Sequence, residues 1–297
     1  MSSDSELLDP LMTRSLIRIC VLSVICALPL FGQEQPQSQP KAVGLGDLLV
    51  APTRVVLEGR DRSAELTLVN TGETTATYRI SFLNLRMNET GQMEEIQEPA
   101  EGEKFSDSII RYSPRQVVLE PRVAQTIRLQ VRKPADLPAG EYRSHMLFRG
   151  VPDLNAVGGG VEDTQTSEGL NIRLIPVYGV SIPVIVRHGE TSVALEIIEP
   201  QYRRGEDGAP DSISARILRE GNRSVYGEFR ATIRRTGEVV GSIRGMGVYV
   251  PNETRVVTLP LQLPEGRVLT GETLELSFID REATEERTLA KADLPIQ

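Results

Sequence analysis

The sequence predicts an all-β protein built from two immunoglobulin-like β-sandwich domains in tandem. Three observations lead to this fold class. From residue 47 onward, short runs of β-branched and aliphatic residues alternate with turns rich in Gly, Pro, Asn and Asp. No segment shows a sustained helical period. The length of 297 residues exceeds that of one small sandwich and suits two domains with an export signal.

The first half of the chain carries the strands of one predicted sandwich. They are expected at 48–57, 63–70, 75–87, 108–119, 123–132, 141–150 and 170–187. The alternation is clear at Ile127, Leu129 and Val131, which places these side chains on one face of a sheet. Seven strands separated by turn residues at this spacing fit an immunoglobulin-like sandwich.

A second set of strands follows in the C-terminal half. They are expected at 192–198, 212–219, 225–234, 238–249, 254–263 and 273–280. Leu274, Leu276 and Phe278 show its clearest alternation. Gly189 interrupts the pattern between the two sets, so the predicted domains are 46–188 and 189–297.

The N-terminus predicts export. Arg14 and Arg18 precede an uncharged apolar run at 19–31, which is the pattern of a signal peptide ending near residue 32. The run is too short to cross a bilayer as a mature helix, so no stable membrane insertion is expected after cleavage. Met12 is an alternative start, because the residues before it are acidic. A Gln- and Pro-rich flexible leader is expected at 33–45.

The residues of common catalytic and metal sites are scarce. Cys20 and Cys26 both lie inside the predicted signal, so the mature chain has no disulfide, thiol nucleophile or Cys-ligated metal. His145 and His188 are the two histidines, and no further ligands lie at metal-binding spacing. We therefore predict no enzyme activity, no catalytic residue, no cofactor and no metal. The net charge of -8 argues against nucleic acid as the main partner.

Two further stretches have simple structural interpretations. Acidic residues crowd the segment between two predicted strands, which indicates a solvated acidic loop; they are Glu94, Glu95, Glu98, Glu101 and Glu103. The glycines at 158–160 are not followed by Lys-Ser/Thr, so they do not form a phosphate-binding loop and are predicted to open a flexible stretch.

Five pieces of the first half occur in a recognisable order. They are LVAPTRVVLEG at 49–59, VNTG at 69–72, YSPRQVVLEP at 112–121, QTIRL at 125–129, and LPAGEYRS at 137–144. This succession resembles the N-terminal domain of the PapD-like periplasmic chaperones of pilus assembly. The second half resembles that family only in its architecture.

The resemblance implies a function and a set of partners. It implies a periplasmic chaperone that donates a β-strand to an incomplete pilin-like subunit until an outer-membrane usher receives the subunit. The family's Arg that binds the terminal carboxylate of the subunit falls on Arg54. The alternating aliphatics of the donated strand fall on Leu170, Ile172 and Leu174.

The sequence departs from the family in ways that leave alternatives open. The Lys that the family pairs with its first-strand Arg corresponds to Gly179 or Ser181, and Arg173 is a candidate for the second charge. An acidic residue of the family is replaced by Arg143. Arg54 could instead be a solvated strand residue, and the three aliphatics could fill the protein's own core. The alternative function is an envelope structural or adhesion module that binds protein or glycan.

Overall fold

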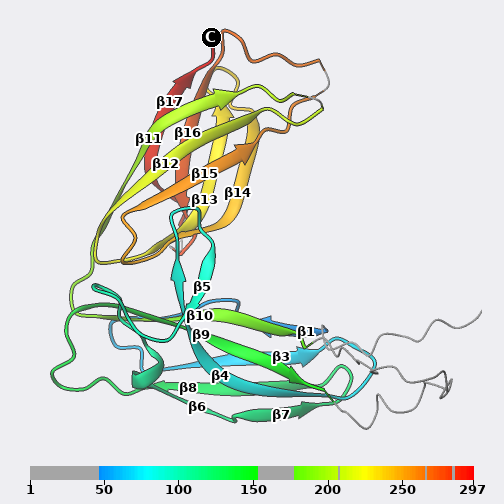
Figure 1. Ribbon diagram of the computed structural model, residues 1–297, viewed down its shortest axis with the longest axis vertical. Helices are drawn as coiled ribbons and strands as arrows, with labels where there is room; N and C mark the ends of the chain where they lie inside the picture. The colour runs from blue at the N-terminus through cyan, green and yellow to red at the C-terminus, as the bar shows by residue number, and fades with distance from the viewer. Residues whose placement is uncertain (1–46, 153–176, 207, 265, 283–284) are drawn as a thin grey trace, which may run out of the picture. The chain divides into compact units, whose positions relative to one another are not determined.

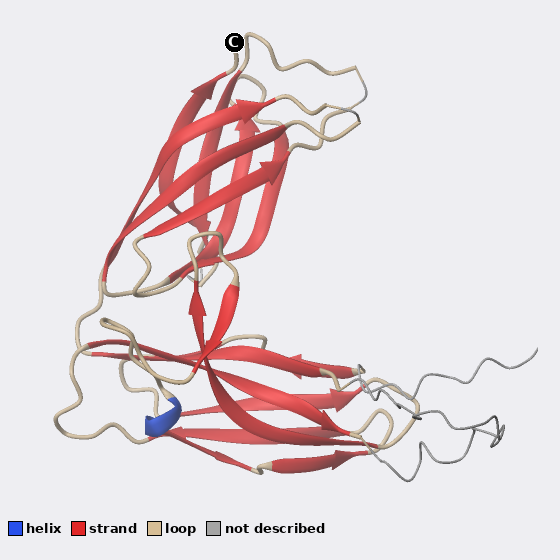
Figure 2. Ribbon diagram, in the orientation of Figure 1, coloured by secondary structure: helices blue, strands red, loops and turns tan. Residues whose placement is uncertain are grey.

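The computed structural model describes residues 47–152, 177–206, 208–264, 266–282 and 285–297. This part of the chain is all-β, with no α-helix and one short 3-10 helix, η1 (Asp107–Ile109). Figures 1 and 2 show its strands, which form four sheets. Two sheets make each of two immunoglobulin-like sandwiches in tandem, so the predicted fold class is confirmed.

Within the described residues, the first sandwich contains ten strands. They are β1 (Leu48–Ala51), β2 (Val55–Leu57), β3 (Ser63–Asn70), β4 (Ala76–Met87), β5 (Met93–Ile96), β6 (Ile110–Ser113), β7 (Gln116–Leu119), β8 (Ala124–Val131), β9 (Gly140–Val151) and β10 (Gly179–His188). One sheet has the order β1-β3-β8-β6, and the other has the order β2-β10-β9-β4-β5, with β7 also pairing with β4. The alternating Ile127, Leu129 and Val131 are buried in the core between them.

Two predicted strands are each divided in the structure. The predicted strand 48–57 becomes β1, which pairs with β3, and β2, which pairs with β10 in the other sheet. The predicted strand 108–119 becomes β6 and β7, again in different sheets. Pro52 and Pro114 lie at the two breaks. A proline has no N–H for the ladder, so regular pairing stops there and the chain crosses to the opposite sheet.

The predicted acidic loop is partly wrong. Residues Met93–Ile96 form the strand β5, which pairs with the end of β4 and keeps Glu94 and Glu95 exposed. Glu103 is not solvated, because both of its carboxylate oxygens accept hydrogen bonds from Arg86, at 2.7 and 2.8 Å. That pairing joins residues 17 positions apart, which a local pattern does not reveal.

The second sandwich contains seven strands. They are β11 (Val193–Arg203), β12 (Ser212–Gly221), β13 (Val225–Ile233), β14 (Val239–Val248), β15 (Thr254–Pro260), β16 (Thr273–Asp280) and β17 (Arg287–Pro295). Its sheets have the orders β11-β12-β15 and β14-β13-β16-β17. Leu274, Leu276 and Phe278 are buried in its core. β17 was not predicted, because most of its side chains are exposed or half-buried and give no apolar alternation.

A short connection joins the two sandwiches. β10 ends at His188 and β11 begins at Val193, and among the described strands no sheet takes members from both sides of this connection. Gly189 has φ +68°, a left-handed conformation that favours glycine. The division into domains 46–188 and 189–297 remains a proposal.

Candidate functional site

The strand β10 is open along part of one edge. On one side it pairs with β9 over its whole length, from Gly179 to His188. On the other side β2 pairs with it in parallel over three residues only, Val184–Val186. Within the described residues, the backbone from Gly179 to Pro183 therefore has one neighbouring strand. Such an edge presents N–H and C=O groups that can pair with another chain.

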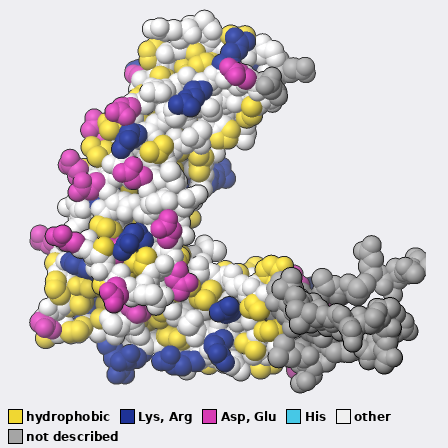
Figure 3. Space-filling view, viewed as in Figure 1, with side chains coloured by type: hydrophobic (Ala, Val, Ile, Leu, Met, Phe, Trp, Pro, Cys, Tyr) yellow, Lys and Arg dark blue, Asp and Glu magenta, His cyan; other side chains and the backbone are white. Residues whose placement is uncertain are grey.

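Apolar side chains are exposed at the same place. Val177, Tyr178 and Val180 are 40%, 57% and 38% exposed, although Ile182 and Val184 on the same strand are buried in the core. Figure 3 shows, in yellow, the hydrophobic side chains on one face of the molecule. The open edge therefore offers both backbone groups and apolar surface to a partner.

Arg54 lies at the end of this open edge. It immediately precedes β2, whose first residue, Val55, pairs with Val184 of β10. Its guanidinium lies over the rings of Tyr226 and Tyr249, 4.7 and 5.4 Å from their centroids. Such stacking stabilises a guanidinium and fixes its plane.

All three nitrogens of the Arg54 guanidinium have a close polar neighbour, although Nη2 makes no hydrogen bond. Nε and Nη2 contact Oε1 of Glu282 at 2.8 and 2.6 Å, and Nη1 donates to the hydroxyl of Tyr249 at 2.9 Å. The side chain is 10% exposed. Arg54 is therefore an ordered, paired residue and not a solvated strand arginine.

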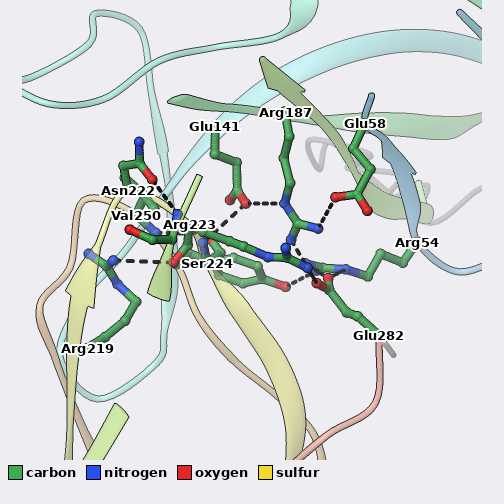
Figure 4. Close-up of polar contacts among 12 residues, drawn as sticks. Arg54, Glu58, Glu141, Arg187, Arg219, Asn222, Arg223, Ser224, Val250 and Glu282 are labelled. Carbon is green, nitrogen blue, oxygen red and sulfur yellow. Dashed lines mark hydrogen bonds and ion pairs between the residues drawn. The ribbon is translucent and has the colours of Figure 1, made fainter. Parts of the chain in front are cut away.

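Arg187, near the end of β10, is the centre of a buried ionic cluster (Figure 4). Its side chain is 3% exposed and contacts three carboxylates: Glu141 at 3.0 Å, Glu282 at 2.7 Å and Glu58 at 3.1 Å. Figure 4 shows Arg54 and Arg187 both directed at Glu282. Glu282 thus accepts from Arg54 through one oxygen and from Arg187 through the other.

The electrostatics of the cluster favour its charged forms. Burial alone raises the pKa of Glu282, but the positive charges of Arg54 and Arg187 outweigh burial and lower it. Burial alone lowers the pKa of Arg187, but Glu141 and Glu282 outweigh it and raise that pKa. The paired ions are therefore stable in the folded protein at neutral pH.

Residues of both sandwiches surround the ionic cluster. Tyr249 packs with Met87, Ile185 and Val56 in a small apolar cluster, and Arg143 lies over its ring at 4.4 Å from the centroid. The turn between β4 and β5 also contacts the second sandwich. Val256 of β15 donates its backbone N–H to the carbonyl of Glu89 at 2.8 Å.

His145, on β9, is held neutral by its surroundings. Burial, followed by the charges of Arg143 and Arg54, lowers its pKa from 6.5 to about 3. The unfolded chain takes up a proton as the pH falls through 6.5, whereas the folded protein does so only near 3. The contribution of neutral His145 to stability is therefore complete above pH 6.5 and is lost as the pH falls toward 3.

We expect the free energy of unfolding to decrease between pH 6.5 and 5 by up to about 1.4 kcal/mol per pH unit because of this histidine. His145→Gln should flatten that slope, since a neutral amide does not titrate. Urea unfolding of both proteins across this pH range measures the two slopes. An unchanged slope in the variant would exclude His145 as its source.

Comparisons with known proteins return structures but no sequence relatives. No family model matches the sequence, and no curated protein matches it. Several chaperones are among the solved structures similar to this chain. The YadV chaperone is 13% identical at a TM-score of 0.44, with 84% of this chain and all of that chain covered.

Two other chaperone structures give similar values. The CupB2 chaperone of Pseudomonas aeruginosa is 13% identical at a TM-score of 0.42, with 84% of this chain and all of that chain covered. A third structure is the CsuC–CsuE chaperone–tip adhesion subunit pre-assembly complex from the archaic chaperone-usher Csu pili of Acinetobacter baumannii. It is 11% identical at a TM-score of 0.42, with 84% of this chain and 99% of that chain covered.

The structure places some of the predicted site residues and not others. Arg54 lies in the ionic cluster at the end of the open edge. Leu170, Ile172 and Leu174, with Arg173, lie outside the described residues. Gly179 and Ser181, where the family's Lys was expected, are exposed positions of β10.

The sequence prediction missed the partners of Arg54. Glu282 is 228 positions away in the sequence, and Tyr249 is 195 positions away. No local pattern marks either residue. A weak signal existed for Arg187, because an Arg follows the apolar run 182–186 and must be paired if that end of the strand is buried.

The described residues contain neither a candidate metal site nor a membrane-spanning helix. In the described ranges, no group of three or more His, Cys, Asp and Glu residues could hold a metal ion. Over the same residues, the structure has no helix that is both long and apolar enough to cross a membrane.

Proposed function

We propose that this protein is a periplasmic chaperone that stabilises pilin-like subunits by pairing a β-strand with them before an outer-membrane usher receives the subunit. The observation that carries the proposal is the open edge of β10 from Gly179 to Pro183, with its exposed Tyr178 and Val180. Strand addition at such an edge gives affinity through main-chain hydrogen bonds, and alternate side chains give specificity.

The register of β2 indicates how a client strand would lie. β2 pairs with β10 in parallel from Val184 onward, so a client strand at Gly179–Pro183 would occupy the preceding part of the same edge. If the client runs parallel to β10, its C-terminal end meets Arg54. A guanidinium with fork geometry suits a terminal carboxylate. This agrees with the role that the sequence resemblance implies for Arg54.

The sequence before β10 supports a longer donated strand. Leu170, Ile172 and Leu174 have the same even-numbered parity as Tyr178, Val180 and the buried Ile182. Side chains two residues apart on a strand share a face. In the proposed chaperone, Leu170, Ile172 and Leu174 enter a groove of the client, and each buried aliphatic contributes roughly 1.5–3 kcal/mol to the complex.

Changing Leu170, Ile172 and Leu174 together to Ser should abolish client binding without unfolding the protein. The reason is that the proposal places these side chains in the client and the core of the first sandwich elsewhere, in residues such as Val184 and Val186. Co-purification from the periplasm and thermal unfolding of the isolated variant are the two measurements. A variant that unfolds would show that these residues belong to the protein's own core.

A further inference from the structure

The edge of the Arg54 guanidinium formed by Nε and Nη2 already faces a carboxylate. Oε1 of Glu282 accepts a hydrogen bond from Nε and lies 2.6 Å from Nη2, which makes no hydrogen bond, and the hydroxyl of Tyr249 accepts one from Nη1. The guanidinium also lies over the rings of Tyr226 and Tyr249. A carboxylate binds a guanidinium in fork geometry through two neighbouring N–H groups, and the Nε–Nη2 edge that offers this geometry is covered by Glu282.

From this geometry we infer that Glu282 is an internal competitor for the carboxylate site of Arg54. Its carboxylate occupies the Nε–Nη2 edge that the terminal carboxylate of a client would take, and the client binds this edge by replacing it. This inference rests on the function proposed above. It assigns a role to Glu282, which neither the sequence pattern nor the comparisons suggested.

Glu282 can leave Arg54 without becoming an unpaired buried charge. Its second oxygen contacts Arg187 at 2.7 Å, and Arg223 lies 3.7 Å from the same oxygen. Losing one of several cationic partners costs much less than leaving a buried carboxylate with none. The exchange therefore needs only a small movement of Glu282 toward Arg187.

The exchange discriminates between partners by charge. When a client carboxylate replaces Glu282, one ion pair is exchanged for another and Arg54 stays neutralised. When a neutral group replaces Glu282, a guanidinium that is 10% exposed loses its only close carboxylate among the described residues. Burying an unpaired charge is strongly unfavourable. Glu282 thus makes the end of the open edge selective for a strand that ends in a free carboxylate.

The test uses sodium acetate as a carboxylate probe and the full mature chain. The side-chain Nε–Hε NMR signal of Arg54, assigned through Arg54→Lys, is followed during an acetate titration at constant ionic strength. In the wild type, Glu282 competes and acetate should shift the signal weakly. In Glu282→Gln the charged competitor is gone, and the apparent affinity for acetate should rise at least about tenfold.

Glu58→Gln is the matched control. Glu58 is also a carboxylate partner of Arg187, at 3.1 Å, but its carboxylate has no contact with Arg54. Its removal should leave the acetate affinity of Arg54 at the wild-type value. Equal affinities in Glu282→Gln and the wild type would overturn the inference, and so would an increase of the same size in Glu58→Gln.

A second variant covers the case in which Glu282→Gln does not fold. Glu282→Asp keeps the charge beside Arg187, but its shorter side chain reaches Arg54 less well. Its acetate affinity should therefore lie between those of the wild type and Glu282→Gln. A wild-type affinity in this variant would contradict competition. No client takes part in these titrations. A negative titration would therefore overturn competition by Glu282 and leave strand pairing at β10 untouched. Failure of strand pairing would be seen in client-binding experiments instead.

Discussion

Arg187→Met should lower the free energy of unfolding by about 3–5 kcal/mol, which is the cost of removing one partner from a buried ionic cluster. The Arg187 side chain is 3% exposed and its partner Glu141 is 1% exposed. Without Arg187, Glu141 keeps one backbone hydrogen bond, from the N–H of Ser224 at 3.2 Å. A buried carboxylate with so little compensation is strongly unfavourable in the folded state.

Arg128→Met is the matched control for this prediction. Arg128 pairs with Glu65 at 3.1 Å, but the two side chains are 81% and 62% exposed, so the change should cost at most about 1 kcal/mol. Urea unfolding of both variants gives the comparison. Adding Glu141→Gln to Arg187→Met should recover part of the loss, because it removes the stranded charge. If Arg187→Met and Arg128→Met lowered the free energy of unfolding by similar amounts, the ionic cluster would contribute no more than an exposed ion pair.

A single charge on the open edge of β10 should strongly weaken client binding. Val180→Lys places an ammonium on the edge of β10, which is one of the means by which natural proteins prevent strand addition. Losing the burial of one aliphatic, about 1.5–3 kcal/mol, weakens the complex by roughly 10- to 150-fold. Val180 is already 38% exposed, so the isolated protein should stay folded.

Val239→Lys is the control for the edge variant. Val239 is 51% exposed on β14, which is an edge strand of the second sandwich. A client that pairs with β10 should bind this variant as it binds the wild type. The amount of client that co-purifies with each protein measures the effect. If both variants lose the client equally, a general surface effect explains the loss better than strand pairing does.

The fold class could be predicted from the sequence because it depends on local patterns. The alternation at Ile127, Leu129 and Val131 fixes which side chains enter the core, and turn residues fix where strands end. The pattern failed where an edge strand is mostly exposed, as in β17, and where a proline moved the chain between sheets at Pro52.

The candidate site was only half predictable for a related reason. Arg54 was found through the order of short motifs around it, which resembles a known family. Its partners Glu282 and Tyr249 belong to the second sandwich, and only folding brings them to Arg54. Charge pairing across such separations leaves no periodic trace in the sequence. The sequence therefore identified a cation with the chemistry to bind a carboxylate, and the structure identified the carboxylate beside it.

Hydrogen exchange of the backbone amides of β10 tests strand pairing most directly. The measurement compares the isolated protein with its complex with a co-purified client. In the isolated protein, some amides at Gly179–Pro183 should exchange quickly because that edge has no second strand among the described residues. In the complex, these amides should become protected, while Val184–Val186, already paired with β2, should change little. Client binding that leaves 179–183 unprotected, or that protects an edge of the second sandwich instead, would contradict the proposed mechanism.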